Sequence, residues 1–238
     1  MAWESPHLTP PLGLAEIGEF VARFDADFGG RLSGFFNYAR VVALAHFAVL
    51  THGRGLTRQE HIGVVSGSDN ELELRFLASE KLTTLAFEDG HDLDKPWLDA
   101  PSPNFSMTLC NQVLEHVFNP HLAFRNLIHC TRPGGHIYVS IPTINCIHGE
   151  PNFYSSGFHP RFLERLALES GLEIVGLGYW GSYKYMVNAV SGYWLAEKQL
   201  VIGAKEGGLN PLLGHVDGRI RDDQFITDCW GLFQRPAP

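Results

Sequence analysis

The chain has 238 residues, of which 45% are hydrophobic and 18% charged, a composition typical of a soluble globular domain with a sizeable core. Its formal net charge of −8 argues against a dedicated nucleic-acid surface, because phosphate binding requires clustered lysine and arginine. The longest apolar stretch, around 41–50, is interrupted by His46 and is too short to span a bilayer, so no membrane partner is expected.

The four cysteines lack the spacing of a metal-binding or redox motif, and two of them lie in apolar runs typical of strands. We therefore expect reduced, buried thiols and a cytoplasmic location. The first twenty residues show no basic segment followed by an apolar one, so no signal peptide is expected. The cysteines are Cys110, Cys130, Cys146 and Cys229.

Two helices are predicted ahead of residue 58, after an extended arm at 1–12. The first, at 14–28, has apolar residues at helical spacing and ends at Gly29-Gly30. The second, at 35–50, is apolar over most of its surface, so we expect it to be buried or to lie over a pocket.

The aromatic residues of this second helix have two interpretations. They either pack in the core or form a lid over an apolar ligand, since ligand pockets are lined by aromatic side chains. We expect an N-terminal arm and helical cap over 1–58 and a single α/β domain over 59–238. The aromatic residues are Phe35, Phe36, Tyr38 and Phe47.

A repeating strand–helix pattern begins near residue 61 and predicts a twisted, mainly parallel sheet with helices on both faces. Ligands of such sheets bind at the carboxyl ends of the strands, so the loops after the strands should carry the chemistry. A turn is predicted at Pro133-Gly134-Gly135. The predicted strands are 62–65, 82–87, 105–110, 136–141, 172–177 and 227–233, and the predicted helices are 71–77, 121–130 and 160–170.

The segment Val113-Leu114-Glu115-His116-Val117 is followed by Asn119-Pro120 and later by Arg132-Pro133-Gly134-Gly135. With these elements, in this order and spacing, the chain resembles class I S-adenosylmethionine-dependent methyltransferases over roughly residues 60–180. The resemblance implies a Rossmann-like methyltransferase fold, S-adenosylmethionine as cofactor, and an antiparallel last strand at 227–233. The stretch from His148 to Gly171 is similar to one that borders the acceptor pocket in small-molecule and sugar methyltransferases.

The loop after the first predicted strand departs from the family pattern. The family has an acidic residue followed by Gly-x-Gly-x-Gly, whereas this chain has Val64-Val65-Ser66-Gly67-Ser68-Asp69-Asn70. Serine and asparagine also enter tight turns, so Ser66, Gly67 and Ser68 remain the predicted cofactor loop. The stretch between the strands at 82–87 and 105–110 is short and leaves little room for the family's intervening helix and strand.

An acidic residue follows the second predicted strand. Glu88 lies 21 residues after Gly67, where Rossmann-like folds place a carboxylate that accepts hydrogen bonds from ribose hydroxyls. Asp89 can take this role if the register differs by one residue. The alternative is that both are solvated loop acids.

Two further pairs are candidate cofactor contacts by resemblance. Asp92-Leu93 resembles the pair in which the acid accepts from the adenine amino group and the apolar residue packs on the ring. An Asx turn is the alternative for Asp92. Asn111 and Gln112 follow the strand at 105–110 and are expected to line the cofactor and the transferring methyl group.

Histidines are the candidate catalytic residues, because a neutral imidazole suits general-base catalysis near pH 7. His116, His148 and His159 lie in or after the methyltransferase-like segment. We expect His148, Tyr154 and Tyr38 to contact the acceptor. The alternative is structural, since the chain holds 12 histidines.

The spacing Gln112-x-x-Glu115-His116 resembles the Glu-x-x-Glu-His metal motif of small-RNA 2′-O-methyltransferases and ubiquinone-pathway O-methyltransferases. In those proteins a later histidine completes a divalent-ion site, and His148 or His159 is placed for that role. Gln112 replaces the first carboxylate, which weakens a site for a hard ion such as Mg²⁺. We therefore assign no metal, and Glu115 and His116 otherwise cap and pack the turn.

The sequence thus predicts methyl transfer from S-adenosylmethionine to a hydroxyl or similar nucleophile of a small molecule, such as a sugar or natural product. One alternative is a non-catalytic methyltransferase-like binding or scaffold protein, which the altered glycine loop motivates. The other is a nucleotide-dependent enzyme such as a dehydrogenase, against which the Leu-Glu-His-Val and Pro-Gly-Gly elements argue. The sequence carries no signal for oligomeric state.

Overall fold

The computed structural model describes residues 5–9, 38–98, 101–145, 148–181 and 226–238, together with a few single residues. Most of the predicted helix at 14–28 lies outside the described residues. So do Phe35, Phe36, the side chain of Tyr38, Cys146, Tyr183 and Tyr185.

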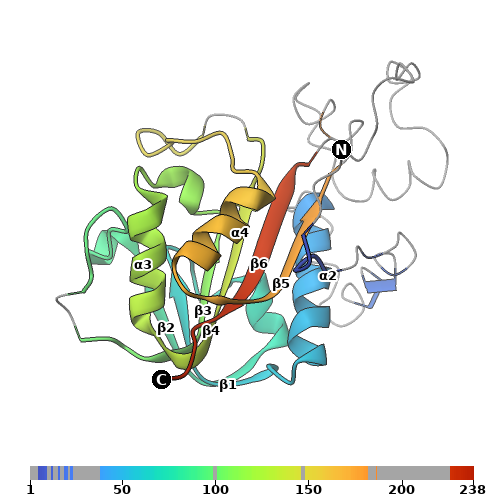
Figure 1. Ribbon diagram of the computed structural model, residues 1–238, viewed down its shortest axis with the longest axis horizontal. Coiled ribbons are helices and arrows are strands. Elements are labelled where there is room, and N and C mark those ends of the chain that lie inside the picture. Colours follow the sequence, from blue (N-terminus) through green and yellow to red (C-terminus); the bar gives the residue numbers. More distant parts are fainter. Residues whose placement is uncertain are drawn as a thin grey trace.

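Six strands form one sheet in the order β2-β1-β3-β4-β6-β5 (Figure 1). The pairs from β2 to β4 are parallel, whereas β6 is antiparallel to both β4 and β5. The mainly parallel sheet and its antiparallel last strand are therefore as predicted. The strands are β1 (Arg58–Val65), β2 (Ala78–Leu85), β3 (Phe105–Asn111), β4 (Thr131–Pro142), β5 (Glu173–Trp180) and β6 (Asp228–Gln234).

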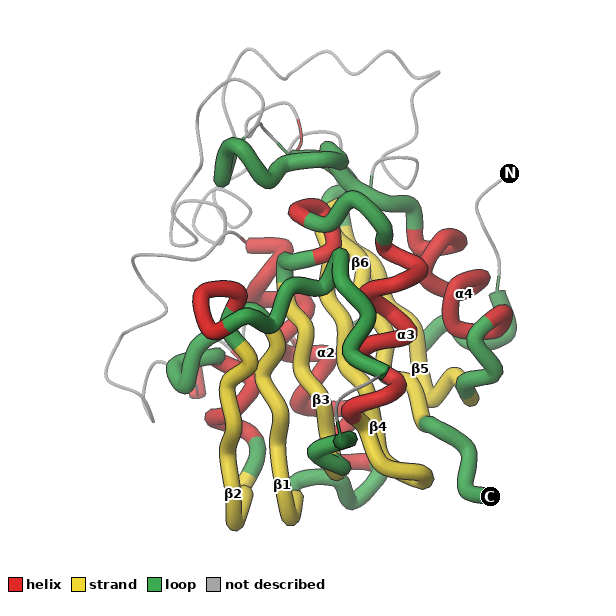
Figure 2. Tube along the Cα trace, turned by 90° about the vertical axis from the view of Figure 1, so that its left-hand side faces the viewer, coloured by secondary structure: helices red, strands yellow, loops and turns green. Residues whose placement is uncertain are grey.

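Helices cover both faces of this sheet, as expected (Figures 1 and 2). α2 (Tyr38–Gly53) packs on one face against β5 and β6, while α3 (Pro120–Cys130) and α4 (Pro160–Glu169) pack on the other. α3 begins where it does because the Asn119 side chain accepts a hydrogen bond from the Leu122 amide at 3.0 Å and Pro120 occupies the first turn.

The sheet separates the core into two apolar layers. On the α2 side, Phe47 is fully buried and its ring lies 4.6 Å from that of Tyr138. On the α3 and α4 side, Phe124 packs 5.7 Å from Phe233. Phe47 is therefore a core residue rather than part of a lid, and α2 belongs to the same packed unit as the sheet. The proposed boundary at residue 58 stays a prediction.

Two local predictions need correction. The helix predicted at 71–77 is a five-residue 3-10 helix, Leu72–Phe76, because only a few residues separate the β1 loop from β2. The turn predicted at Pro133-Gly134-Gly135 lies inside β4, where the register against β3 shifts. Gly134 has a φ of 74°, and its amide donates to the carbonyl of Arg235, so the kinked backbone still pairs with the chain after β6.

The connection from β2 to β3 is as short as expected. Between them the described residues form only a short 3-10 turn, Phe87–Asp89, and no strand. Cys110, Cys130 and Cys229 are buried free thiols, in line with the expectation for the cysteines that the structure describes. None of the described helices combines the length and apolar character that crossing a bilayer requires.

Two phenylalanines near the start of α3 give a matched test of this packing. Phe124 is 0% exposed and Phe118 is 76% exposed. We expect Phe124→Ala to lower the free energy of unfolding by about 3–5 kcal/mol, since it removes core contacts and leaves a cavity. Phe118→Ala should change it by no more than about 0.5 kcal/mol. Urea unfolding followed by circular dichroism measures both, and equal effects would contradict the packing described.

Candidate functional site

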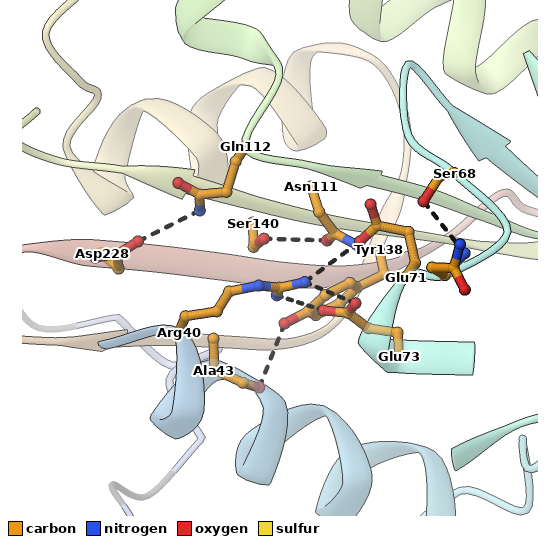
Figure 3. A network of polar contacts seen from close by, with 11 residues as sticks. Arg40, Ala43, Ser68, Glu71, Glu73, Asn111, Gln112, Tyr138, Ser140 and Asp228 are labelled. Atoms are coloured by element: carbon orange, nitrogen blue, oxygen red, sulfur yellow. Dashed lines mark hydrogen bonds and ion pairs between the residues drawn. The ribbon is translucent and has the colours of Figure 1, made fainter. Parts of the chain in front are cut away.

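One edge of the sheet gathers the carboxyl ends of β1, β2, β3, β4 and β5. Because β6 runs antiparallel, its first residue lies at this same edge, and Asp228 pairs with Pro142 of β4 and Trp180 of β5. Almost all the predicted site residues follow these strands. The topology therefore brings them to one side of the molecule. Figure 3 shows three of them, Ser68, Asn111 and Gln112, with the polar network around Arg40.

The loop after β1 holds the predicted cofactor residues Ser66, Gly67 and Ser68. Ser66 has a φ of 52°, a left-handed conformation, and its amide donates to the carbonyl of Leu85 at the end of β2 at 2.9 Å. A Cβ on Gly67 would lie 2.8 Å from a carboxylate oxygen of Glu71. The retained glycine thus makes room for this carboxylate at the mouth of the loop.

Arg40 of α2 joins the two acids that follow this loop. Its guanidinium donates to both carboxylate oxygens of Glu73, at 2.5 and 2.8 Å, and lies 3.4 Å from Glu71 (Figure 3). The Glu73 side chain is fully buried. Burial disfavours the charge of Arg40, but the carboxylates outweigh it and raise the pKa of Arg40 above its usual value.

The network of ion pairs and hydrogen bonds around Arg40 continues to β3 and β4. Asn111 donates to Glu71 at 3.2 Å and accepts from the Ser140 hydroxyl at 3.0 Å. Burial raises the pKa of Glu71, and Glu73 raises it further, while Arg40 and Asn111 oppose the shift. Asn111 is therefore held at the predicted position, with its amide already engaged by protein groups.

Gln112 also lies at this edge, in a left-handed conformation with a φ of 54°. Its side chain donates to Asp228 at 3.3 Å, and its backbone amide donates to the Ser140 carbonyl at 2.7 Å. Burial raises the pKa of Asp228 to about 8. The amide of Gln112 is thus directed toward the start of β6.

The acids after β2 differ in their surroundings. Glu88 and Asp89 are exposed in the 3-10 turn Phe87–Asp89. Asp92 accepts from the Asp94 amide at 2.9 Å and pairs with Lys95 at 3.2 Å, so it forms the Asx turn that was its alternative.

Leu93 is 3% exposed and lies in the core on the α3 side. Its side chain therefore serves the core in this structure instead of offering a face to a ring. Of these acids after β2, Glu88 and Asp89 are the exposed ones, so the structure leaves the predicted role of Glu88 and the alternative at Asp89 open.

His116 and His148 come together, although 31 residues separate them in sequence. Their Nε2 atoms lie 3.1 Å apart, and the Nδ1 of His116 lies 2.6 Å from the backbone carbonyl oxygen of Asn152. A carbonyl can only accept, so Nδ1 carries the proton. In neutral His116 the Nε2 lone pair therefore faces His148.

Glu115 precedes this pair on the 3-10 turn Leu114–His116 and is fully buried. Neither of its carboxylate oxygens has a hydrogen-bond partner among the described residues, and one lies 3.9 Å from His116 Nε2. Burial raises the pKa of Glu115 to about 7. Glu115, His116 and His148 form the group of described residues whose ligand atoms lie within 4.8 Å of one another.

The loop after β4 is fastened over this turn. The amides of Tyr154 and Ser155 both donate to the Glu115 carbonyl, at 2.9 and 3.1 Å. Tyr154 is half exposed, and its ring lies 5.6 Å from that of the exposed Phe118. The backbone of the predicted acceptor residue Tyr154 is thus held at Glu115, while the ring against both histidines is that of the preceding Phe153.

His159 has a different position. It caps α4, with its Nδ1 accepting from the Arg161 amide at 3.1 Å. Burial and then the neighbouring Arg161 lower its pKa. The structure gives His159 a capping role, and His116 and His148 are the predicted histidines that it brings together.

Sequence reasoning did not identify Arg40, Glu71, Glu73 and Asp228 as members of the site. A signal was present for the first, because a single arginine in an otherwise apolar helix requires a buried partner. Nothing in the local sequence identified that partner as the acids after β1.

Replacing Arg40 tests the network. We expect Arg40→Met to lower the free energy of unfolding by about 3–5 kcal/mol, because it leaves the Glu73 carboxylate buried without its partner. The matched control is Arg165→Met, which removes the exposed pair with Glu169 and should cost at most about 1 kcal/mol. Denaturant unfolding compares the two, and similar losses would show that the buried pair is unimportant.

The pKa of Asp228 predicts a pH dependence. The carboxyl group of an aspartate in an unfolded chain has a pKa of about 3.9, whereas burial raises the pKa of folded Asp228 to about 8. Between these values the folded state binds more protons, so stability falls as pH rises. The Asp228→Asn variant does not lose stability in this way, because asparagine does not titrate.

The stability of the natural protein relative to the Asp228→Asn variant should therefore decrease between pH 5 and 8 and then level off. Urea unfolding of both proteins at several pH values measures this difference. Glu71 and Glu115 titrate in both and cancel. A difference that is independent of pH would contradict the raised pKa.

No protein-family profile matches the chain, and no curated protein matches it either. Among solved structures, the chain is similar to the [4+2]-cyclase SpnF, at 13% identity over 98% of each chain with a TM-score of 0.49. It is similar to the N-methyltransferase NodS of Bradyrhizobium japonicum WM9, solved with S-adenosyl-L-homocysteine, at 12% identity over 94% of this chain and 98% of that one, with a TM-score of 0.48. It is also similar to phosphoethanolamine N-methyltransferase 2 of Haemonchus contortus, solved with S-adenosyl-L-methionine. The identity is 11% over 92% of this chain and 60% of that one, and the TM-score is 0.46. This likeness is limited to the path of the chain and says nothing about activity.

Proposed function

We propose that the chain is an S-adenosylmethionine-dependent methyltransferase that acts on a hydroxyl or similar nucleophile of a small molecule. The observation that carries the proposal is the pairing of the two candidate cofactor segments. The Ser66–Ser68 loop and Glu88 follow the adjacent parallel strands β1 and β2, and the Ser66 amide fastens the loop to the end of β2. The Leu-Glu-His-Val and Pro-Gly-Gly resemblance supports the choice of cofactor.

The residues at this edge fit such a cofactor. Ser66 and Ser68 are exposed, so the backbone of the loop is accessible to a ligand. Glu88 is exposed next to it and offers two acceptor oxygens for the ribose hydroxyls. When bound, S-adenosylmethionine supplies an activated methyl group for transfer to a nucleophile.

The network around Arg40 provides charges for the amino-acid end of the cofactor. Glu71 lies against Gly67 and presents a carboxylate at the mouth of the loop, close to Asn111. A carboxylate there attracts an ammonium group, and Arg40 behind it, already bound to Glu73, holds Glu71 in place. We propose that these residues position the cofactor rather than take part in the reaction.

The histidine pair and Tyr154 mark the acceptor side. They belong to the loops after β3 and β4, away from the β1–β2 side where Glu88 lies. We propose that a small acceptor enters beside Tyr154 and Phe118, whose exposed rings provide an apolar surface, and that His116 and His148 orient its nucleophilic group. Correct orientation contributes a large share of the rate enhancement in transfer reactions of this kind, on the order of 7–11 kcal/mol.

Calorimetric titration with S-adenosylmethionine and S-adenosylhomocysteine tests the cofactor assignment. We expect micromolar binding by the natural protein. Glu88→Ala should weaken it by about ten- to a hundredfold, since hydrogen bonds to a charged group contribute about 1.5–3 kcal/mol.

The matched control is Glu80→Ala, which replaces an exposed acid near the start of β2, whereas Glu88 follows the end of that strand. It should bind as the natural protein does. No heat and no thermal shift at millimolar ligand, with and without candidate acceptors, would reject the methyltransferase proposal and favour a methyltransferase-like binding protein.

A further inference from the structure

We propose that Glu115, His116 and His148 form a binding site for a divalent transition-metal ion of the zinc type. The proposal reverses the assignment from sequence, which found no metal at this position. It rests on the side-chain geometry and on the surroundings of each ligand, not on the proposed methyl transfer.

The spacing of the two imidazoles suits a shared ion. Two nitrogens bound to one tetrahedral zinc at about 2.0–2.1 Å lie roughly 3.3–3.4 Å apart. The Nε2 atoms of His116 and His148 lie 3.1 Å apart. The nearer carboxylate oxygen of Glu115 is 3.9 Å from His116 Nε2, and the ligand atoms of all three residues lie within 4.8 Å of one another.

The hydrogen bond at Nδ1 selects the tautomer of the neutral His116 ring that can bind a metal through Nε2. Its Nδ1–H donates to the Asn152 carbonyl, which leaves the Nε2 lone pair directed toward the cluster. Histidines that bind metals commonly donate their other ring N–H to a carbonyl or carboxylate in this way. Gly149 makes room for the ring, because a Cβ at this position would lie 2.9 Å from His116 Cε1.

Glu115 supplies the independent observation. Its carboxylate is completely buried beside the two imidazoles, and both oxygens are without a hydrogen-bond partner among the described residues. Such a group is costly to bury unless it is paired or coordinates a metal. An ion between Glu115 and the histidines would give the carboxylate oxygens a partner. Both Nε2 atoms could then bind the ion instead of each other.

The set of donors selects the kind of ion. One carboxylate and two imidazoles favour zinc and related transition metals, whereas Mg²⁺ prefers oxygen ligands throughout. Gln112, which occupies the first position of the motif-like sequence, is directed to Asp228, and His159 caps α4. Three protein ligands leave at least one position open for water or for an oxygen atom of an acceptor.

Metal binding can be measured without any cofactor, so the result does not depend on methyl transfer. The full chain is treated with a chelator and titrated with Zn²⁺, Mn²⁺ or Mg²⁺ by calorimetry. We expect one equivalent of Zn²⁺ to bind, more tightly than Mn²⁺, and Mg²⁺ to bind weakest. Co²⁺ added in place of Zn²⁺ should give a visible absorption spectrum.

The variants His148→Ala and Glu115→Gln remove ligands, and His121→Ala replaces a histidine outside the cluster that is exposed, as His148 is. Removing a hydrogen-bond partner of a metal ligand typically weakens metal binding roughly 10–100-fold. Removing a ligand itself should weaken Zn²⁺ binding at least as much. His121→Ala should bind as the natural protein does. Circular dichroism checks folding, and His148 is exposed, so its replacement should leave the fold intact.

Two results would overturn the proposal. One is the absence of stoichiometric Zn²⁺ binding and of a Co²⁺ spectrum in the natural protein. The other is Zn²⁺ binding that is equally tight in the natural protein, His148→Ala and Glu115→Gln, which would place the ion elsewhere.

Discussion

The buried ion pair between Arg40 and Glu73 joins α2 to the short helix that follows the β1 loop. Arg40 comes from a helix on the face of the sheet, and Glu73 comes from the short turn that follows the β1 loop. Because this ion pair has little access to water, separating it exposes each partner to a large desolvation cost. The position of Glu71, and through it that of Asn111, depends on the same guanidinium.

The sequence was sufficient for the architecture because the architecture depends on periodic patterns. Apolar runs such as 105–110 and the amphipathic helix at 160–170 are visible in the sequence, and their alternation predicts a parallel sheet. The local errors are at Pro133–Gly135 and 71–77. At Gly134 the backbone pairs with Arg235, which is far away in sequence, and at 72–76 the few residues between the β1 loop and β2 leave room for a 3-10 helix only.

The candidate site was predictable only in part. The resemblance to a metal motif named Glu115 and His116 and left His148 and His159 as alternatives for the later histidine, and the structure brings His148 to the other two. That Gln112 is directed to Asp228 follows from the insertion of β6 next to β4, which no local pattern contains. The sequence therefore named candidate ligands for this cluster. Which of them lie close enough to share an ion, and that Gln112 does not, follows from the topology.

The position of β6 also has a consequence for how the sheet assembles. Among the described strands, β5 pairs with β6 alone, and β6 comes last along the chain, so β5 joins this sheet only once β6 pairs on both sides. The pairs of β6 with β4 close a long stretch of chain, which makes them entropically costly to form early. The strands β2, β1, β3 and β4 can therefore pair without β6, and Asp228, at the edge where the histidine cluster lies, takes its place only when β6 pairs with β4.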